Sequence, residues 1–294
     1  MFNNIQGLNF NTTTLQSPSV KGATDSEDVS IFGNNLLDDS TVKLTKEQKK
    51  AQKEAKKAER ERIKNTPDGV IQGGKQGSTA GDCWLLAQMN SMSKTSWGKE
   101  ALKNAITKEN DGSFTVHFKG VNKDITVSAE EFKKAQRNSD YSSGDADALL
   151  LEVAMDKHFK AENINSGSIK GNDLAGEDSL QFVLTGAKGY QTKKEEYFKP
   201  ILQLMGENPE TNADVSATYI YYDKNQGSNG TNHVLSVQQV VLGDKGKIKE
   251  IVLKDSYSPD RTFTMSYGQF VNEMQAFGFT TTPKSFQKSG QKSE

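Results

Sequence analysis

The sequence lacks what builds disulfide-linked, membrane-spanning and nucleic-acid-binding proteins. Its 294 residues contain one cysteine, Cys83, so no internal disulfide forms and a reducing compartment suits the chain. No apolar run is long enough to cross a bilayer. The N-terminus has neither the positive start nor the apolar block of a Sec signal peptide, which leaves only non-classical export. The 37 basic and 38 acidic residues nearly cancel, so no overall field favours nucleic acid. We therefore expect a cytoplasmic protein.

Apolar residues are scarce too, at 33% of the chain, so part of the chain should not belong to a core. Residues 1–43 are rich in Asn, Thr, Ser, Asp and Gly, which predicts a disordered arm. Residues 44–66, with the run "TKEQKKAQKEAKKAERERIKN", have no apolar stripe and predict a solvated helix held by charge pairs. Such a charge run is ordinarily a spacer. The alternative is a basic segment that binds a partner or the cleft of the following domain.

Residues 67–288 look folded, with a short tail at 289–294. The part up to about residue 188 is mainly helical, and the part from about 189 to 288 is mainly strand, so we expect an α+β fold of two lobes with a cleft near "TGAKGY". Expected helices lie in "CWLLAQMNSM", "DADALLLEVAMDKHFKAEN", "GEDSLQFVLTG" and "SYGQFVNEMQAF". Expected strands lie in "SFTVHFKG", "DITVSAEEF", "SATYIYYDK", "NHVLSVQQVVL", "KIKEIVLKDSY" and "RTFTMSY".

Cys83 stands behind a glycine-containing loop, at the start of the expected buried helix "CWLLAQMNSM". Unpaired backbone N–H groups and the helix dipole favour a thiolate there. Gly81 lets the chain turn and lets a substrate backbone come close. A lone cysteine is more often a small buried residue. A catalytic interpretation therefore needs a base from elsewhere in the chain.

Of the three histidines, one stands out. His117 lies within an alternating strand, and His158 lies on the outer part of an amphipathic helix. Both are interpreted as surface or structural histidines. His233 differs, because it opens a strand directly after the loop "DKNQGSNGTN", and loops held by rigid strands often carry catalytic groups.

The partner of His233 follows from the register of a hairpin. If the turn "GDKGK" centres on Lys245, the numbers of opposed residues sum to about 490. His233 then faces Tyr257, and Asp255 lies on the same strand face two residues away. A carboxylate there fixes the tautomer of the imidazole and supports its charged form. A one-residue slip would break this arrangement.

Several motifs occur together in one order. "QGSTAGDCWLLA" is similar to Q-G-x-x-G-D-C-W with one extra residue, and "ADALLLEVAMDKHF" is similar to a helix around L-L-E-K-A-Y. "GEDSLQFVLTG" precedes a Gly-rich joint, "NHVLSVQQVV" is similar to G-H-A-Y-S-V, and "IVLKDSY" stands where a strand ends in Asn-Pro-Trp. "FTMSYGQFVNEMQAFGF" is similar to M-S-F-x-D-F. Over residues 68–283 the chain thus resembles the catalytic core of calpains, which are papain-like cysteine proteases.

The resemblance implies a two-lobed papain-like fold, with a helical lobe that carries the cysteine and a β-rich lobe that carries the histidine. It implies hydrolysis of protein or peptide bonds in the cleft. Cys83 would be the nucleophile, His233 the general base and then acid, and Asp255 the orienting group. Gln76 would donate to the oxyanion, and Trp84 would support the site.

Three differences from the family pattern bear on these roles. Asp255 stands where the family has Asn, and its negative charge should raise the pKa of the histidine. Tyr257 takes the place of the Trp that shields the pair. Gln76 lies seven residues before Cys83 rather than six, so the extra residue must bulge out.

Calcium is implied by the resemblance alone, because no EF-hand loop is present and Glu152, Glu177 and Asp178 have no calcium-site spacing.

Two alternatives to a peptidase stay open. A transglutaminase-type acyl transferase also uses Cys, His and Asp in this order, and Asp255 suits it. An inactive protease fold used as a binding module is the other.

Overall fold

A computed structural model describes residues 66–71, 73–77, 81–171, 176–223 and 231–287, together with Lys50 and Lys53. These residues belong to one compact unit, Gln48–Glu294. The expected arm at 1–43, nearly all of the expected helix at 44–66 and the tail at 289–294 lie outside the described residues. No helix among the described residues has the length and apolarity needed to cross a bilayer.

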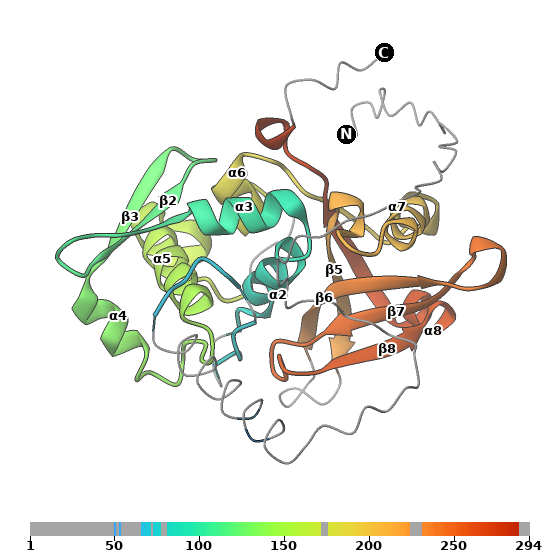
Figure 1. Cartoon of the computed structure of the whole chain (residues 1–294), viewed down its shortest axis with the longest axis horizontal. Helices are drawn as coiled ribbons and strands as arrows, with labels where there is room; N and C mark the ends of the chain where they lie inside the picture. The colour runs from blue at the N-terminus through green and yellow to red at the C-terminus, as the bar shows by residue number, and fades with distance from the viewer. Residues whose placement is uncertain are drawn as a thin grey trace, which may run out of the picture. The chain divides into compact units, whose positions relative to one another are not determined.

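The first part of the fold, here called the helical half, spans residues 81–186 and is mainly helical (Figure 1). Its helices are α2 (Cys83–Met92), α3 (Ser96–Asn104), α4 (Ala129–Ala135), α5 (Ala146–Glu162) and α6 (Leu180–Thr185), with a 3₁₀ turn at Ile164–Gly167. A small antiparallel sheet, β1 (Ile106–Lys108), β2 (Phe114–Phe118) and β3 (Lys123–Val127), lies beside α5. The Asp145 carboxylate caps α5 by accepting from the Ala148 N–H at 3.0 Å.

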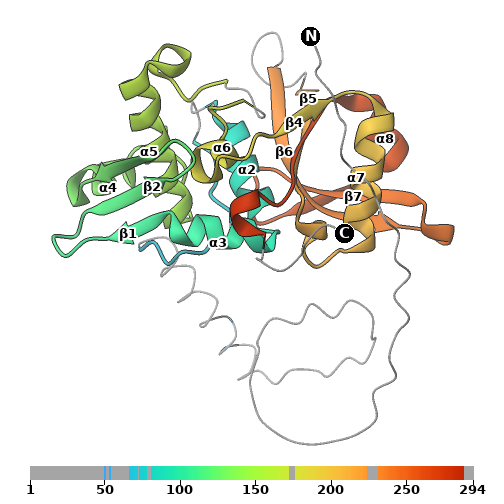
Figure 2. The same ribbon diagram turned by 90° about the horizontal axis from the view of Figure 1, so that it is seen from above.

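The second part, here called the sheet half, spans residues 190–287 and contains a six-stranded antiparallel sheet in the order β4-β9-β5-β6-β7-β8. Its strands are β4 (Tyr190–Thr192), β5 (Ser216–Asp223), β6 (Thr231–Leu242), β7 (Ile248–Lys254), β8 (Thr262–Ser266) and β9 (Met274–Thr280). Its helices are α7 (Glu195–Glu207) and α8 (Tyr267–Glu273), with 3₁₀ turns at Asn212–Asp214, Asp244–Gly246 and Lys284–Phe286. Figure 2 shows this half on the right, with α7 and α8 beside its strands.

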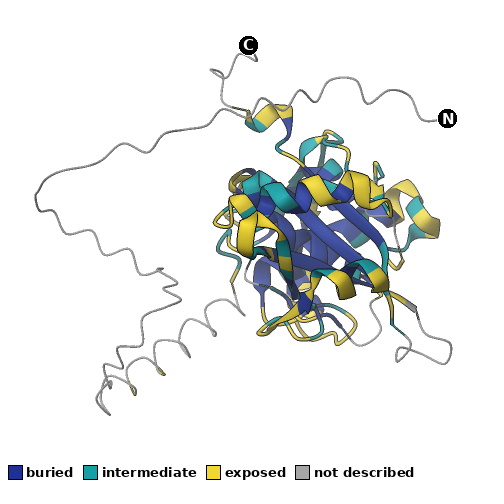
Figure 3. Ribbon diagram, turned by 90° about the vertical axis from the view of Figure 1, so that its right-hand side faces the viewer, coloured by how far each residue is buried: buried dark blue, intermediate teal, exposed yellow. Residues whose placement is uncertain are grey.

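The described apolar residues form two core clusters, and the buried strands and helices are dark blue in Figure 3. One cluster lies within the sheet half, whereas the other fills the helical half and includes Ile220, Val234 and Ala276 of the sheet half. In the sheet half, Phe198 of α7 and Phe270 of α8 pack with Phe277 of β9. Helix α2 belongs to the helical half and also packs on β5 and β6. At that junction the Ser91 hydroxyl lies 2.7 Å from the Ser216 hydroxyl, so a buried polar contact joins the two halves.

The predicted register of the β6–β7 hairpin is confirmed. Lys245 lies at the centre of the 3₁₀ turn with φ of +59°. Paired positions sum to 490 at Ser236 and Lys254, to 491 between two bulges, and to 490 again at Leu242 and Ile248. The first bulge adds a residue to β6 and the second adds one to β7, so their effects on the register cancel. His233 therefore keeps its predicted place opposite the end of the β7 segment.

The mixed helix and strand content expected from the sequence is confirmed, whereas several elements were not predicted. Helix α7 was missed although its buried residues recur at helical spacing, and the misleading feature is Pro200 within it. Strand β9 was missed because "NEMQAF" was expected to continue a helix, which ends at Glu273. The segment "SAEEF" begins α4 rather than extending a strand, because Ser128 and Glu131 form a capping box.

The expected position of His158 on the outer part of a helix is wrong. Its ring is buried between Phe118 of β2 and Phe159 of α5, with ring centroids 5.4 Å and 6.3 Å away. Burial is the main cause that lowers the pKa of His158. The small sheet covers this face of α5, and the periodicity of the helix alone does not show that cover.

Gly120 gives a test of how the small sheet joins α6. A methyl group on Gly120 would lie 1.8 Å from the Phe182 carbonyl oxygen and 2.4 Å from the Gly186 nitrogen. Gly120→Ala should therefore lower the free energy of unfolding in urea by about 3 kcal/mol. Gly268→Ala is the matched control, because nothing lies within 4 Å of the added methyl group there. Equal stability of the two variants would contradict this account.

Candidate active site

Cys83 is the first residue of α2, as the sequence predicts, and it is partly exposed. The rest of that helix is buried from Trp84 to Met92. The Trp84 indole N–H donates to the Ile169 carbonyl at 2.6 Å, which fastens the start of α2 to the loop after α5. Trp84 thus supports the position of Cys83. The thiol lies at the exposed tip of an otherwise buried helix.

Asp82 stands at the N-cap position of α2, but its side chain makes no capping hydrogen bond. Its carboxyl lies against that of Glu152 from α5, and both side chains are fully buried. Burial and the neighbouring Asp82 charge hold the pKa of Glu152 well above its usual range. The raised pKa favours the neutral form of Glu152, close to the candidate nucleophile.

His233 lies in β6 with only 2% of its side chain exposed, and its Nε2 is 2.9 Å from Asp255 Oδ1. The Asp255 oxygen also accepts from the Tyr257 N–H at 2.8 Å. The Tyr257 ring stacks on the imidazole with centroids 4.9 Å apart. Tyr257 thus covers the pair, as the resemblance implies.

Tyr221 is a further neighbour that the sequence reasoning missed. It pairs directly with His233 between β5 and β6, and its ring meets the imidazole edge-on at 5.9 Å. The charges of Asp255 and Cys83 act on its hydroxyl, so it belongs to the site. The signal available was the aromatic run "YIYY" in the strand before the loop.

The electrostatics of the site favour a charged imidazole. Burial lowers the pKa of His233, but hydrogen bonds to Asp255 and to Cys83, with their charges, raise it to about 9. Burial likewise opposes ionisation of Asp255, yet the hydrogen bonds from His233 and from the Tyr257 N–H bring its pKa below the usual range. The fold thus brings thiol, imidazole and carboxylate together, each from a different segment.

Gln76 is buried, and its side-chain carbonyl accepts from the Ser256 hydroxyl at 2.7 Å. The Gln76 backbone N–H donates to the Ser256 carbonyl at 2.9 Å. Its Nε2 makes no hydrogen bond to any residue that the structure describes. The amide is therefore oriented with its donor end unused, as an oxyanion donor requires. Residues 78–80, where the extra residue should bulge, lie outside the described ranges.

Ser256 was not predicted, and no local pattern could have found it. It lies 180 residues from Gln76 and is buried between Asp255 and Tyr257. Its hydroxyl donates to the side-chain carbonyl of Gln76, and its backbone carbonyl accepts from the backbone N–H of Gln76. The segment Asp255–Tyr257 thus orients both the histidine and the candidate oxyanion donor.

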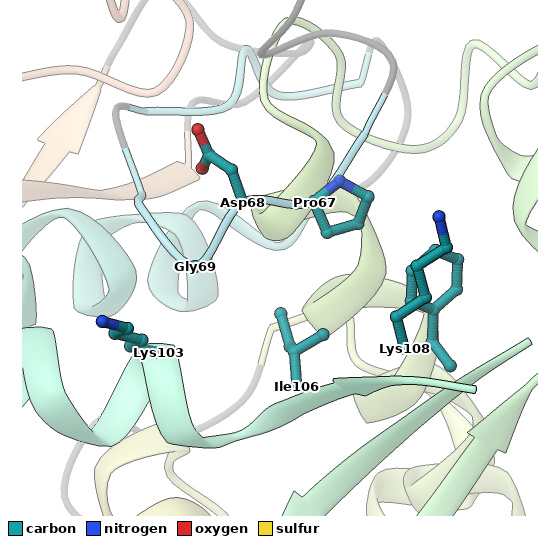
Figure 4. Close-up of a pocket in the computed structure, with 7 residues that line it drawn as sticks. Pro67, Asp68, Gly69, Lys103, Ile106 and Lys108 are labelled. Atoms are coloured by element: carbon teal, nitrogen blue, oxygen red, sulfur yellow. The ribbon is translucent and has the colours of Figure 1, made fainter. Parts of the chain in front are cut away.

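The other sequence candidates are separate from this site. His117 on the small sheet bonds Asp124 at 2.8 Å and Thr107 at 2.9 Å, which explains it as a cross-strand contact. A shallow hollow of about 260 Å³ lies where residues 67–69 cross the β1 strand, with Lys103 and Lys108 on either side of Ile106 (Figure 4). None of its lining residues belongs to the Cys83 site.

Two of the carboxylates considered for calcium have other neighbours. Glu152 lies against Asp82, and Glu177 forms an exposed ion pair with Lys188 at 2.6 Å. In the described ranges, no three His, Cys, Asp or Glu side chains are grouped to hold a metal ion. Calcium therefore stays an expectation from the resemblance.

The Asp255 charge can be tested by titration. Asp255→Asn should lower the pKa of His233 by about one unit or more, because the imidazolium loses its carboxylate partner. NMR titration of the three histidine rings measures this, with the His233 signal assigned from His233→Gln. Asp124→Asn, which removes a carboxylate from a different histidine, is the control and should leave the titration of His233 unchanged. An unchanged His233 titration in Asp255→Asn would contradict the proposed electrostatics.

Comparison with known proteins adds no relatives to this picture. No protein-family model matches the chain, and no curated protein matches it. The function is therefore inferred from the residues of the site and from their geometry.

Proposed function

We propose that this chain is a cysteine endopeptidase of the papain-like, calpain-like type, which hydrolyses bonds in protein or peptide substrates. The observation that carries the proposal is the array of Cys83, His233 and Asp255. Cys83 opens a buried helix, the buried imidazole contacts it, and the carboxylate holds the far nitrogen at 2.9 Å. Nucleophile, base and orienting group are the parts that covalent acyl transfer needs.

A two-lobed papain-like fold is part of the same proposal. One apolar cluster lies within the sheet half, and a second fills the helical half and extends to β5, β6 and β9. Helix α2 carries Cys83 to the junction with β6, which carries His233. Residues from both halves thus meet at one place. This is where a substrate would bind between two lobes.

The reaction follows from the charges of the pair. The Cys83 thiolate attacks the peptide carbonyl carbon, and the oxyanion that forms accepts from the Cys83 N–H and the free Nε2 of Gln76. The His233 imidazolium protonates the leaving amine as the C–N bond breaks, which leaves a thioester. A water then gives a proton to His233 and attacks the thioester, which releases the acid and regenerates the thiolate and imidazolium.

A transglutaminase-type acyl transfer is the second candidate, and Asp255 is the observation that favours it. In that reaction an amine rather than water attacks the thioester. A binding module without activity is the third. Asp255 as the orienting group is also compatible with hydrolysis, since it supports the charged imidazole.

The substrate of the proposed enzyme is protein or peptide, and we propose no nucleic-acid partner. A single free cysteine suits a reducing compartment, so we place the enzyme in the cytoplasm. The basic segment 44–66 remains a candidate for binding a partner or the cleft. A truncation that begins at residue 66 and keeps the wild-type rate would exclude that role.

The proposal is tested by digesting casein with the wild type and Cys83→Ala, each with calcium and with a chelator. Wild type should cut casein, and Cys83→Ala should lose the activity entirely because no other thiol is present. Incorporation of a labelled amine without cleavage would favour the transferase. Absence of both activities, with no labelling of Cys83 by iodoacetamide at neutral pH, would leave the binding module.

Gln76→Ala tests the oxyanion donor separately. It should lower kcat by roughly 100-fold with little change in KM, because the amide acts on the oxyanion rather than on the bound substrate. Steady-state kinetics with a fluorogenic peptide measure this. Gln203→Ala, at a half-buried glutamine on α7 outside the site, is the matched control. A wild-type kcat in Gln76→Ala would remove Gln76 from the site.

A further inference from the structure

Residues 73–77, here called the strap, carry Gln76 between the two halves of the fold. The Gly73 N–H donates to Asp145 Oδ2 at 3.0 Å, and Lys75 exchanges two backbone hydrogen bonds with Ser143. These contacts fasten one side of the strap to the start of α5. On the other side, Gln76 bonds Ser256 of the sheet half. The position of the Gln76 amide thus depends on both halves.

Lys254 reaches the strap from the sheet half. A methyl group on Gly73 would lie 2.4 Å from Lys254 Nζ, 2.9 Å from its Cε and 3.0 Å from Asn90 Oδ1. The ammonium group therefore occupies the space where any other residue at position 73 would place its side chain. Gly73 also has a φ of +113°, which other residues rarely adopt. The strap and the lysine are fitted to one another.

The charges around Lys254 come from both halves. Burial is the largest cause that lowers the pKa of Lys254, and the nearby Lys94 lowers it further. Asp145 and Asp260 act in the opposite direction and favour the charged form. Asp145 is also the acceptor of the Gly73 N–H. One carboxylate of the helical half therefore acts on both the strap and the lysine of the sheet half.

We propose that Lys254 is a positioning residue, whose ammonium group holds the strap across the two halves so that the Gln76 amide stays aimed at the oxyanion. The inference rests on the proposed function and adds to it. Lys254 immediately precedes Asp255 at the end of β7. The end of one strand thus places the base-orienting carboxylate and the support of the oxyanion donor together.

Lys254→Met is the direct test, because it keeps most of the side-chain volume and removes the charge. It should lower kcat for a fluorogenic peptide by about 10-fold to 100-fold without raising KM, since the donor is misplaced only for the transition state. Alkylation of Cys83 by iodoacetamide should keep its wild-type rate, because that reaction needs the thiolate and no oxyanion donor. Lys249→Met on the same strand, where the lysine is exposed, is the control.

A double variant separates positioning from a merely structural effect. If Lys254 acts through Gln76, adding Lys254→Met to Gln76→Ala should cost little further activity. Hydrogen exchange at residues 73–77 should rise in Lys254→Met and stay unchanged in Lys249→Met.

The possible results separate the role of Lys254 from the proposed function. Independent losses in the double variant, or unchanged kcat and exchange in Lys254→Met, overturn the role of Lys254. A wild type that hydrolyses no peptide overturns the proposed function instead, and the exchange of the strap amides then decides whether Lys254 holds the strap at all.

Discussion

The pairing of β6 with β7 determines whether this chain has a site at all. It sets His233 opposite the segment after Lys254, so that Asp255 reaches the imidazole and Tyr257 stacks on it. Two bulges lie in this pairing, one on each strand, and only their cancellation keeps the register. A strand shifted by one residue would turn its side chains to the opposite face. Cys83, held by the separate packing of α2, would then have no base.

Four consecutive residues, Lys254 to Tyr257, contact most of the other residues of the site. Asp255 orients the imidazole, Ser256 orients the Gln76 amide, Tyr257 covers the pair, and Lys254 approaches the strap. In the proposed mechanism, this arrangement couples the base of the nucleophile to the oxyanion donor, since the positions of both depend on where one strand ends. The buried contacts of α2 with β5 and β6 keep this strand end in place relative to Cys83.

The sequence predicts the parts that depend on local patterns. The apolar run after Cys83 predicts a buried helix, and the turn around Lys245 predicts the register that joins His233 to Asp255. Contacts between distant segments leave no such pattern. Ser256 meets Gln76 across 180 residues, and His158 is buried only because a separate sheet covers it. Helix α7 and strand β9 were missed for the related reason that tertiary packing overrides a proline or a short helical pattern.

The acid pair of Asp82 and Glu152 makes the free energy of unfolding depend on pH. The pKa of Glu152 in the folded chain lies well above its usual range. At a pH above the ordinary pKa of glutamate, the folded chain therefore binds more protons than the unfolded chain. The free energy of unfolding falls as the pH rises from the ordinary pKa of glutamate toward the raised pKa of folded Glu152. Glu152 thus makes the folded molecule less stable as the medium becomes more alkaline.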